Sequence, residues 1–240
     1  FDNATLLSCD FTGANMTHAT FVQATVQDCT FSTSTLMSHV DFTGAKIFST
    51  DFKNMDLGDA SFNATEINSS SFDGATLYGA TFLATKMMQV SFLGSHVGNP
   101  TQKTGSNFSH STLTEITTSS TSVFDYTRFS QVAFHDCSLN AGSMQHCEFG
   151  YSSWNRVHLT GVNMTKSAFH HTKWTTVRID PTATFTDESF VLSELDDVEF
   201  NGTSLDGVIF DNATVSKSTV KGGCHMATAS FVQATLSDVK

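Results

Sequence analysis

The sequence is poor in several residue types. Its 240 residues include two Pro, two Trp and only 12 Lys and Arg, and charged residues make up 15% of the chain. So few basic residues argue against a protein that binds nucleic acid by neutralising phosphates, which takes clustered Lys and Arg. No apolar run approaches the roughly 18 residues of a membrane-spanning helix, so no membrane span is expected. The 23 acidic residues give a formal net charge of −11.

The chain also lacks an initiator Met and a signal-like apolar stretch, since it opens at Phe1. This predicts a processed product or a fragment of a longer protein. The sequence contains no Cys-x-x-Cys, no zinc-ligand spacing and no His-Glu-x-x-His. We therefore expect neither a metal nor a cofactor.

Phe, by contrast, is abundant. The chain has 22 Phe residues, and their spacing follows a five-residue repeat. From Phe1 a large apolar residue recurs at Leu6, Phe11 and Met16, with a small residue two positions before each later centre. Neither the helix period of 3.6 nor the strand period of 2 produces this spacing. If two residues in five face inward, about 40% of the chain should be apolar. The observed share is 39%.

This pattern of a small residue, a polar one, Leu or Phe, and two polar residues resembles the pentapeptide-repeat family. Ala14-Asn15-Met16-Thr17 and Val40-Asp41-Phe42-Thr43-Gly44 are examples, and the match covers nearly the whole chain. The resemblance implies an all-β fold, a right-handed quadrilateral β-helix solenoid with four pentads per coil. The polar position before the centre is often Thr or Ser here, where the family favours Asp or Asn.

Four pentads per coil predict that residues about 20 apart stack in one column, which gives about twelve coils. The central apolar residues follow the five-residue spacing through Leu36, and the register shifts by one residue near Val40. With this shift, Phe48 is the only Phe that does not fall at a central position. A rod of twelve coils at about 4.8 Å each would be roughly 55 Å long. The core ladder, one Phe per coil, is Phe1, Phe21, Phe42, Phe62, Phe82, Phe108, Phe129, Phe149, Phe169, Phe190, Phe210 and Phe231.

We expect a single domain over residues 1–240 with a few interruptions. Residues 98–107 insert Gly, Pro and Asn between Val97 and Phe108, which predicts a protruding loop at a corner. Residues 114–123 lack a convincing central residue, which predicts an irregular third wall in the sixth coil. Glu188 occupies an inward slot, where an unpaired carboxylate is costly. We therefore expect a local bulge or a paired side chain there.

The candidate modification sites are Asn-x-Ser/Thr sequons, which begin at eight of the Asn residues. All eight fall at outward positions of the repeat and on several walls, so attached glycans would not disturb the core. The alternative is that the polar repeat produces these triplets by accident. The candidates for N-glycosylation are Asn3, Asn15, Asn63, Asn68, Asn107, Asn163, Asn201 and Asn212.

The His and Cys residues do not form a convincing catalytic group, and we assign no catalytic residue. His135-Asp136-Cys137 contains the residue types of a catalytic triad. The side chains should not meet, however, because Cys137 should point inward and His135 outward. The five Cys fall in small inward slots, where buried thiols act as small apolar residues. Cys9 and Cys29 lie one coil apart in one column, where a disulfide is conceivable but strained.

Acidic residues concentrate towards the C-terminal end, and three interpretations are open. They form a solvated face that keeps a rod soluble, or a negative patch that mimics DNA phosphates. Calcium binding by Asp196, Asp197 and Glu199 is a weaker third interpretation. The residues are Asp187, Glu188, Glu194, Asp196, Asp197, Glu199, Asp206 and Asp211.

We predict a non-enzymatic structural protein, because a filled rod lacks the concave pocket of an enzyme. Solenoids usually end in caps, and the pentads here run to both ends of the sequence without one. We therefore expect a secreted, glycosylated solenoid that stacks head to tail into an extracellular filament, or that forms part of a longer fibre at the cell surface. The alternative, which the family resemblance suggests, is an acidic DNA-mimicking module that binds DNA gyrase.

Overall fold

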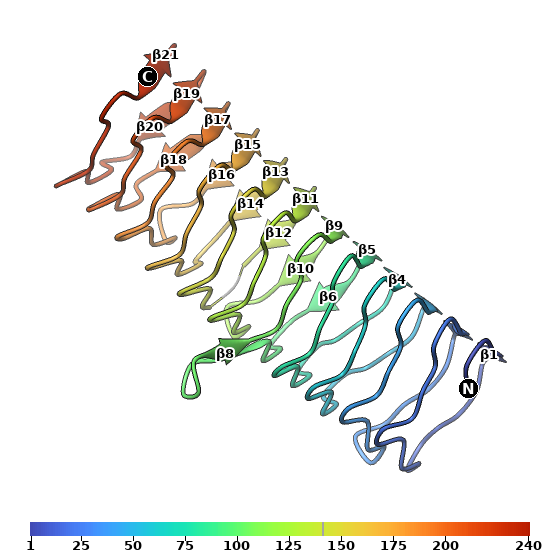
Figure 1. Ribbon diagram of the computed structural model, residues 1–240. Helices are drawn as coiled ribbons and strands as arrows, with labels where there is room; N and C mark the ends of the chain where they lie inside the picture. The colour runs from blue at the N-terminus through green and yellow to red at the C-terminus, as the bar shows by residue number, and fades with distance from the viewer. Residues whose placement is uncertain (141) are drawn as a thin grey trace.

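The structure is a computed structural model that describes residues 1–140 and 142–240. The chain winds into a rod of stacked coils, and the two termini lie at opposite ends of the rod (Figure 1). The described residues form strands, bridges and turns, and none is helical. The expected all-β solenoid of about twelve coils is confirmed. Since the described chain has no helix, it also offers no helix that could cross a membrane.

One wall of the rod is a continuous parallel sheet of twelve strands, one from each coil. Each strand has three residues, and its central side chain points into the rod. The strands pair in register, so that Leu6 lies beside Val26 and Phe134 beside Trp154. In order along the rod they are β1 (Thr5–Leu7), β2 (Thr25–Gln27), β3 (Lys46–Phe48), β4 (Glu66–Asn68), β5 (Lys86–Met88), β9 (Thr112–Thr114), β11 (Ala133–His135), β13 (Ser153–Asn155), β15 (Lys173–Thr175), β17 (Glu194–Asp196), β19 (Thr214–Ser216) and β21 (Thr235–Ser237).

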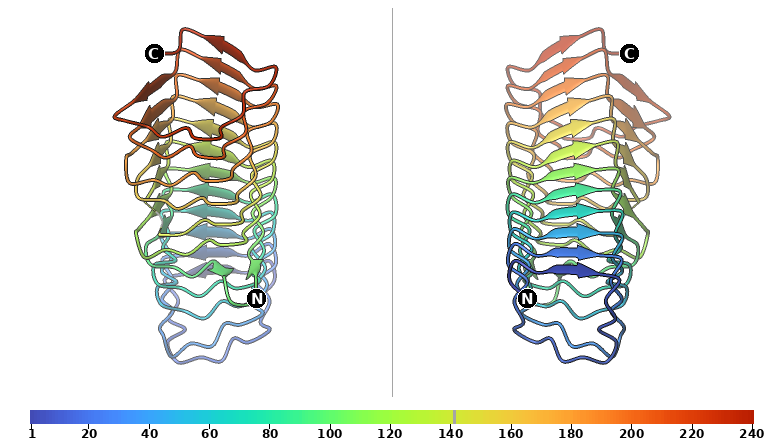
Figure 2. Two further views of the ribbon diagram at one scale, coloured as in Figure 1. Left: turned by 90° about the vertical axis from the view of Figure 1, so that its left-hand side faces the viewer. Right: turned by 90° about the vertical axis from the view of Figure 1, so that its right-hand side faces the viewer.

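The next wall carries a second parallel sheet of seven strands, which begins only in the fifth coil. In the earlier coils this wall is held by isolated parallel bridges, such as Asp10 with Thr30. Figure 2 shows the strands of both sheets stacked across successive coils. The strands of the second sheet are β6 (Ser91–Phe92), β10 (Thr117–Thr118), β12 (Ser138–Leu139), β14 (His158–Leu159), β16 (Arg178–Ile179), β18 (Glu199–Asn201) and β20 (Thr219–Lys221).

Most corners between walls depend on a residue in the left-handed backbone region, two positions after a central residue. Asn3 has φ of 57°, His18 of 59° and Thr176 of 55°. This conformation costs an ordinary residue roughly 1–2 kcal/mol, so core packing and hydrogen bonds between coils must hold the corners. At many corners the central carbonyl also accepts the N–H of the third residue after it, as Phe1 does from Ala4 at 3.0 Å.

The inside of the rod is filled by the central side chains and the small residues before them. All twelve ladder Phe side chains stack in one column, with successive ring centroids 4.4 to 5.3 Å apart and ring planes within 22° of parallel. Such pairs contribute about 0.5–1.5 kcal/mol each beyond their burial. Phe48 faces outward and is half-buried.

The expected position of one core residue is wrong. Leu36 lies outside with 56% of its surface exposed, and Met37 takes the core position at 1%. Thr35 fills the small inward slot before Met37, and its hydroxyl donates to the Phe11 carbonyl at 2.9 Å. The extra residue is therefore absorbed at the corner before Met37, and not near Val40.

Residues 98–107 form a small hairpin that projects from the rod (Figure 1). Its strands are β7 (Gly98–Asn99) and β8 (Thr104–Gly105), which pair antiparallel. At its base the Ser106 N–H donates to the Val97 carbonyl at 3.2 Å. This is the hydrogen bond of an ordinary corner, so the insertion leaves the wall intact.

The segment 114–123 departs from the repeat in a different place than expected. Thr117–Thr118 form β10, in register with β6 and β12. Thr118 takes the core position and is 5% exposed. The irregular part is the corner that follows, where the Ser122 hydroxyl accepts the N–H groups of Ser119 and Gly94.

Candidate functional surfaces

The sequon asparagines all lie on the outside of the rod. Asn3, Asn15 and Asn212 are exposed, and the other five are half-buried. They occupy different walls, and Asn68 ends strand β4 in the twelve-stranded sheet. Glycans on these residues would therefore surround the rod.

Three of these asparagines share one local geometry. The side-chain oxygens of Asn15, Asn107 and Asn163 accept the N–H of the residue two positions later, at 3.1, 3.0 and 3.1 Å. At Asn163 the Thr165 hydroxyl donates to the same oxygen at 2.7 Å. These hydrogen bonds involve only the oxygen of the side-chain amide. The amide nitrogen, to which a glycan would be attached, takes no part in them.

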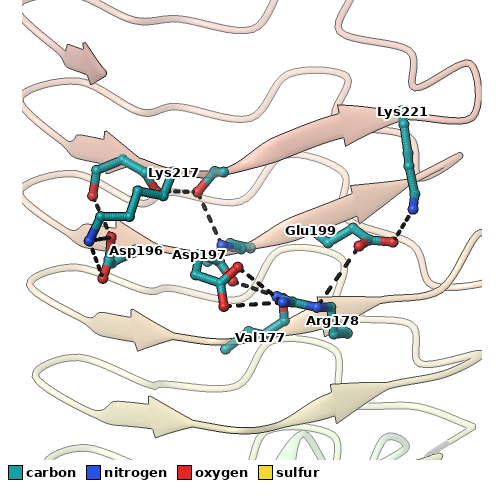
Figure 3. A network of polar contacts seen from close by, with 10 residues as sticks. Val177, Arg178, Asp196, Asp197, Glu199, Lys217 and Lys221 are labelled. Atoms are coloured by element: carbon teal, nitrogen blue, oxygen red, sulfur yellow. Dashed lines mark hydrogen bonds and ion pairs between the residues drawn. The ribbon is translucent and has the colours of Figure 1, made fainter. Parts of the chain in front are cut away.

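Many of the acidic side chains near the C-terminal end are paired with cations from neighbouring coils (Figure 3). Arg178 Nη2 lies 3.0 and 3.1 Å from the two carboxylate oxygens of Asp197. Its Nε lies 3.9 Å from Glu199, which also meets Lys221 Nζ at 2.7 Å. These side chains come from β16, β18 and β20 and the corner at Asp197.

The twelve-stranded sheet carries two more such pairs. Lys173 Nζ lies 3.3 Å from Glu194, and Lys217 Nζ lies 3.2 Å from Asp196. The Ser216 hydroxyl donates to Asp196 at 2.8 Å. That hydrogen bond, followed by Lys217, holds the pKa of Asp196 below its usual range. Exposed pairs of this kind contribute little to stability, because water and salt screen them.

This pairing argues against two interpretations of the acidic segment, DNA mimicry and calcium binding. Four of its eight members have a Lys or Arg partner, so it is not the bare negative surface that would imitate DNA phosphates. Asp196, Asp197 and Glu199 are engaged by those cations. Within the described residues no group of three His, Cys, Asp or Glu side chains is placed to hold a metal ion.

Two further members of the segment stabilise the turn of the next coil. Asp206 accepts the N–H of Ala227 at 2.6 Å, and Asp211 that of Val232 at 2.9 Å. Asp73 accepts the N–H of Leu93 in the same way at 2.8 Å. Sequence reasoning missed this role. Its signal is an Asp directly after a central residue.

Glu188 has neither the bulge nor the partner that its inward position predicts. Its backbone keeps the repeat, since its carbonyl accepts the Ile209 N–H at 2.9 Å. The side chain is fully buried, and neither carboxyl oxygen has a hydrogen-bond partner. Burial raises the pKa of Glu188 to about 8. The carboxyl group is therefore mostly neutral at pH 7.

The His and Cys candidates do not come together. Cys137 is buried and its thiol donates to the Leu113 carbonyl at 3.3 Å, while His135 lies on the outer side of β11. Burial raises the pKa of Cys137 to about 11, far from that of a nucleophilic thiolate. His18 and His39 do lie one above the other, with ring centroids 4.8 Å apart.

Sequence reasoning also missed two aromatic stacks on the outer corners. Tyr126 lies over His146 and Tyr151 over His171, each with ring centroids 4.7 Å apart and planes within 7°. Their signal is a Tyr followed 20 residues later by a His at the same corner position.

Both ends of the described rod leave core side chains uncovered. Phe1 is 52% exposed at one end and Leu236 is 54% exposed at the other. The last coil encloses an apolar hollow of about 270 Å³, whose walls include Phe210, Phe231 and Leu236. Each end of the described rod thus exposes one end of the same column of stacked Phe rings.

The start of the chain matches a known family model. The family model described as pentapeptide repeats (8 copies) matches residues 1–32. No curated protein matches the chain in sequence. Among solved structures, it is similar to HetL, a pentapeptide repeat protein involved in heterocyst differentiation regulation from the cyanobacterium Nostoc sp. strain PCC 7120. That match has 16% identity and a TM-score of 0.44, and covers 98% of this chain and 88% of HetL.

Two further structures show the same kind of similarity. Full-length QnrB1, a plasmid-mediated fluoroquinolone resistance protein, is 13% identical with a TM-score of 0.40, over 78% of this chain and 93% of QnrB1. A pentapeptide repeat protein from the Arabidopsis thaliana thylakoid lumen is 17% identical with a TM-score of 0.31, over 48% of this chain and 68% of that one.

The five-residue period runs through nearly the whole sequence, and the structure converts it into a four-walled coil with one Phe column. The family model matches the first 32 residues, and the same coil continues through the rest of the described chain. The described chain is therefore a β-solenoid built on a five-residue repeat, and its first 32 residues match the pentapeptide-repeat model.

Proposed function

We propose that this protein is a non-enzymatic structural solenoid that is secreted, carries N-linked glycans and stacks head to tail into an extracellular filament. The observation that carries the proposal is the column of twelve Phe rings, which stack in register from coil to coil along the rod. At one end the ring of Phe1 stacks on Phe21 from one side only, and at the other Phe231 stacks only on Phe210.

A second copy of the chain is the occupant that fits these ends. Phe1 of one copy and Phe231 of another are chemically alike, and each already sits 4.9 Å from its neighbour in the column. The apolar hollow in the last coil would receive the central side chains of another first coil. Head-to-tail contacts that continue along the axis of a straight rod do not close into a ring, so they build filaments.

The outer surface supports the glycan part of the proposal. Only 15% of the residues are charged, whereas Ser and Thr are abundant in the sequence. Eight sequons on several walls offer attachment points outside the core. Sugars there would keep a weakly charged filament in solution, and they require a secretory route.

Stacking is tested by two substitutions in the last coil. Leu236 and Val232 are both exposed there, at 54% and 60%, but only Leu236 lines the apolar hollow. We expect L236R to abolish filaments seen by electron microscopy and V232R to leave them unchanged. If the wild-type protein sediments as a monomer at all concentrations, the stacking proposal is wrong.

The glycans are tested separately on native material. Its mass should exceed the 26.0 kDa of the polypeptide and should fall when N-glycans are removed enzymatically. A native mass equal to that of the polypeptide would reject glycosylation without affecting the stacking proposal. The gyrase alternative is tested by a DNA supercoiling assay, in which we expect no effect at micromolar protein.

A further inference from the structure

Cys9 and Cys29 lie directly above one another in the first two coils. The flanking residues are paired across the coils, Leu7 with Gln27 before them and Asp10 with Thr30 after them. The Thr30 N–H also donates to the Cys9 carbonyl at 2.9 Å, which fixes the two backbones. Neighbouring strands of a sheet are about 4.8 Å apart, and disulfides span Cα distances of roughly 4.4–6.8 Å.

The two side chains point into the same space between the walls. The Cys29 thiol donates to the Leu6 carbonyl at 3.5 Å and to the Gln27 carbonyl at 3.4 Å, and the Cys9 thiol donates to the Leu7 carbonyl at 3.7 Å. Burial raises the pKa of Cys29, and the charge and side chain of Cys9 beside it contribute to the same rise. Together with the register of the flanking residues, this places the two side chains in adjacent slots of one column.

The two thiols differ in their access to solvent. Cys29 is 3% exposed, whereas Cys9 is only partly buried. In the same coil Leu6 and Phe11 are also only partly buried. An oxidant can therefore reach Cys9 first, with Cys29 placed to react second.

We propose that Cys9 and Cys29 form a reversible disulfide that joins the first coil to the second. The Cys9 thiolate attacks one sulfur of a disulfide oxidant such as oxidised glutathione, and one glutathione thiolate leaves. The Cys29 thiolate then attacks Cys9 Sγ and releases the second glutathione. The protons of the two protein thiols end on the two reduced glutathione molecules. The cysteines lose two electrons and glutathione disulfide gains them.

The link would close a short loop of one coil and fasten the first coil to the second. A link between in-register parallel neighbours, which are about 4.8 Å apart, is strained, because a disulfide prefers Cβ atoms roughly 3.8 Å apart. Strained and accessible disulfides are the easily reduced, regulatory ones. This inference does not depend on filament formation or on glycans.

The same column supplies a matched control. Cys137 occupies the equivalent slot five coils further on, but its neighbours in the column are Ile116 and Val157. Cys137 therefore has no thiol above or below it. C137S should leave oxidation of the first two coils unchanged.

The test is oxidation of the folded protein with oxidised glutathione at pH 8, followed by unfolding and a count of free thiols. We expect the count to fall from five to three in the wild type, with a mass loss of 2 Da, and to fall by two in C137S as well. Cleavage before Asp10 and Asp28 separates the cysteines, so the link appears as peptide 2–9 joined to peptide 28–40. Dithiothreitol should restore five thiols.

The variant C29S distinguishes the proposed order of events. It should stop at a mixed disulfide, with one glutathione added at Cys9. Five free thiols after oxidation of the wild type, or glutathione retained on Cys9 of the wild type, would overturn the proposal. A disulfide that joins two different chains would overturn it as well.

Discussion

Glu188 is the residue whose replacement should change the stability of the rod most clearly with pH. In the unfolded chain it ionises near its ordinary pKa of 4.5, while in the folded rod burial raises the pKa to about 8. Between these values the folded state holds a proton that the unfolded state has lost. The free energy of unfolding therefore falls as pH rises through this window.

The size of the effect follows from the shift. Each pKa unit corresponds to 1.36 kcal/mol, so moving from 4.5 to about 8 costs the fold about 5 kcal/mol at pH 8 and above. Below pH 4.5 the cost is absent, because both states are protonated. Removing the ionisable group should therefore stabilise the rod, and the gain should grow from pH 5 to pH 8.

The assay compares E188Q with the wild type in urea at pH 5, 6, 7 and 8. Unfolding is followed by the fluorescence of Trp154 and Trp174, which are fully buried in the coils just before Glu188. All other residues are identical in the two proteins, so the difference between them isolates the one carboxyl group. We expect E188Q to gain several kcal/mol by pH 8.

The matched control is E194Q, which makes the same chemical change at an exposed side chain paired with Lys173. It should keep the pH slope of the wild type. Equal slopes for E188Q and the wild type would refute the reasoning. So would an E188Q protein that is less stable than the wild type at pH 8.

Three further predictions concern the walls and corners, each measured by urea unfolding. F149A opens a cavity inside the Phe ladder and should cost about 3–5 kcal/mol, whereas F48A, on the outer face, should cost less than about 1 kcal/mol; equal losses would contradict the ladder's role. T176G relieves a left-handed corner with φ of 55° and should raise stability by up to about 1 kcal/mol; a clear loss would show that the corner is not strained. G98A places a Cβ 1.8 Å from a backbone oxygen, so it should displace the hairpin and speed its amide hydrogen exchange. G150A, with its nearest contact at 3.8 Å, should not.

The fold could be predicted because one residue type marks one column. Phe recurs at a spacing that only a coil of about twenty residues explains, and the structure stacks Phe1 through Phe231 accordingly. Leu36 could not be placed in the same way. Leu36 and Met37 are adjacent and both apolar, so the five-residue period allows either one at the core position. Which residue takes it depends on where the chain accommodates the extra residue.

The outer surface was less predictable than the core for a different physical reason. Arg178 reaches Asp197, 19 residues away, whereas Lys217 reaches Asp196, 21 residues away. Such pairs depend on how long side chains lean across a corner, which the repeat does not encode. The sequence shows that Glu188 places a carboxyl group in an inward slot. It does not show whether another group forms a hydrogen bond with that carboxyl, because this depends on the packing around it.

The hairpin at residues 98–107 shows how such a rod can acquire new parts. Its base restores the corner hydrogen bond between Val97 and Ser106, and Asn107 continues the bridge pattern of its wall with Thr81 and Arg128. The chain thus leaves the coil and re-enters it at the same point of the spiral. Each corner is therefore a possible insertion site, at which an epitope or a binding loop can be grafted without altering the ring column inside.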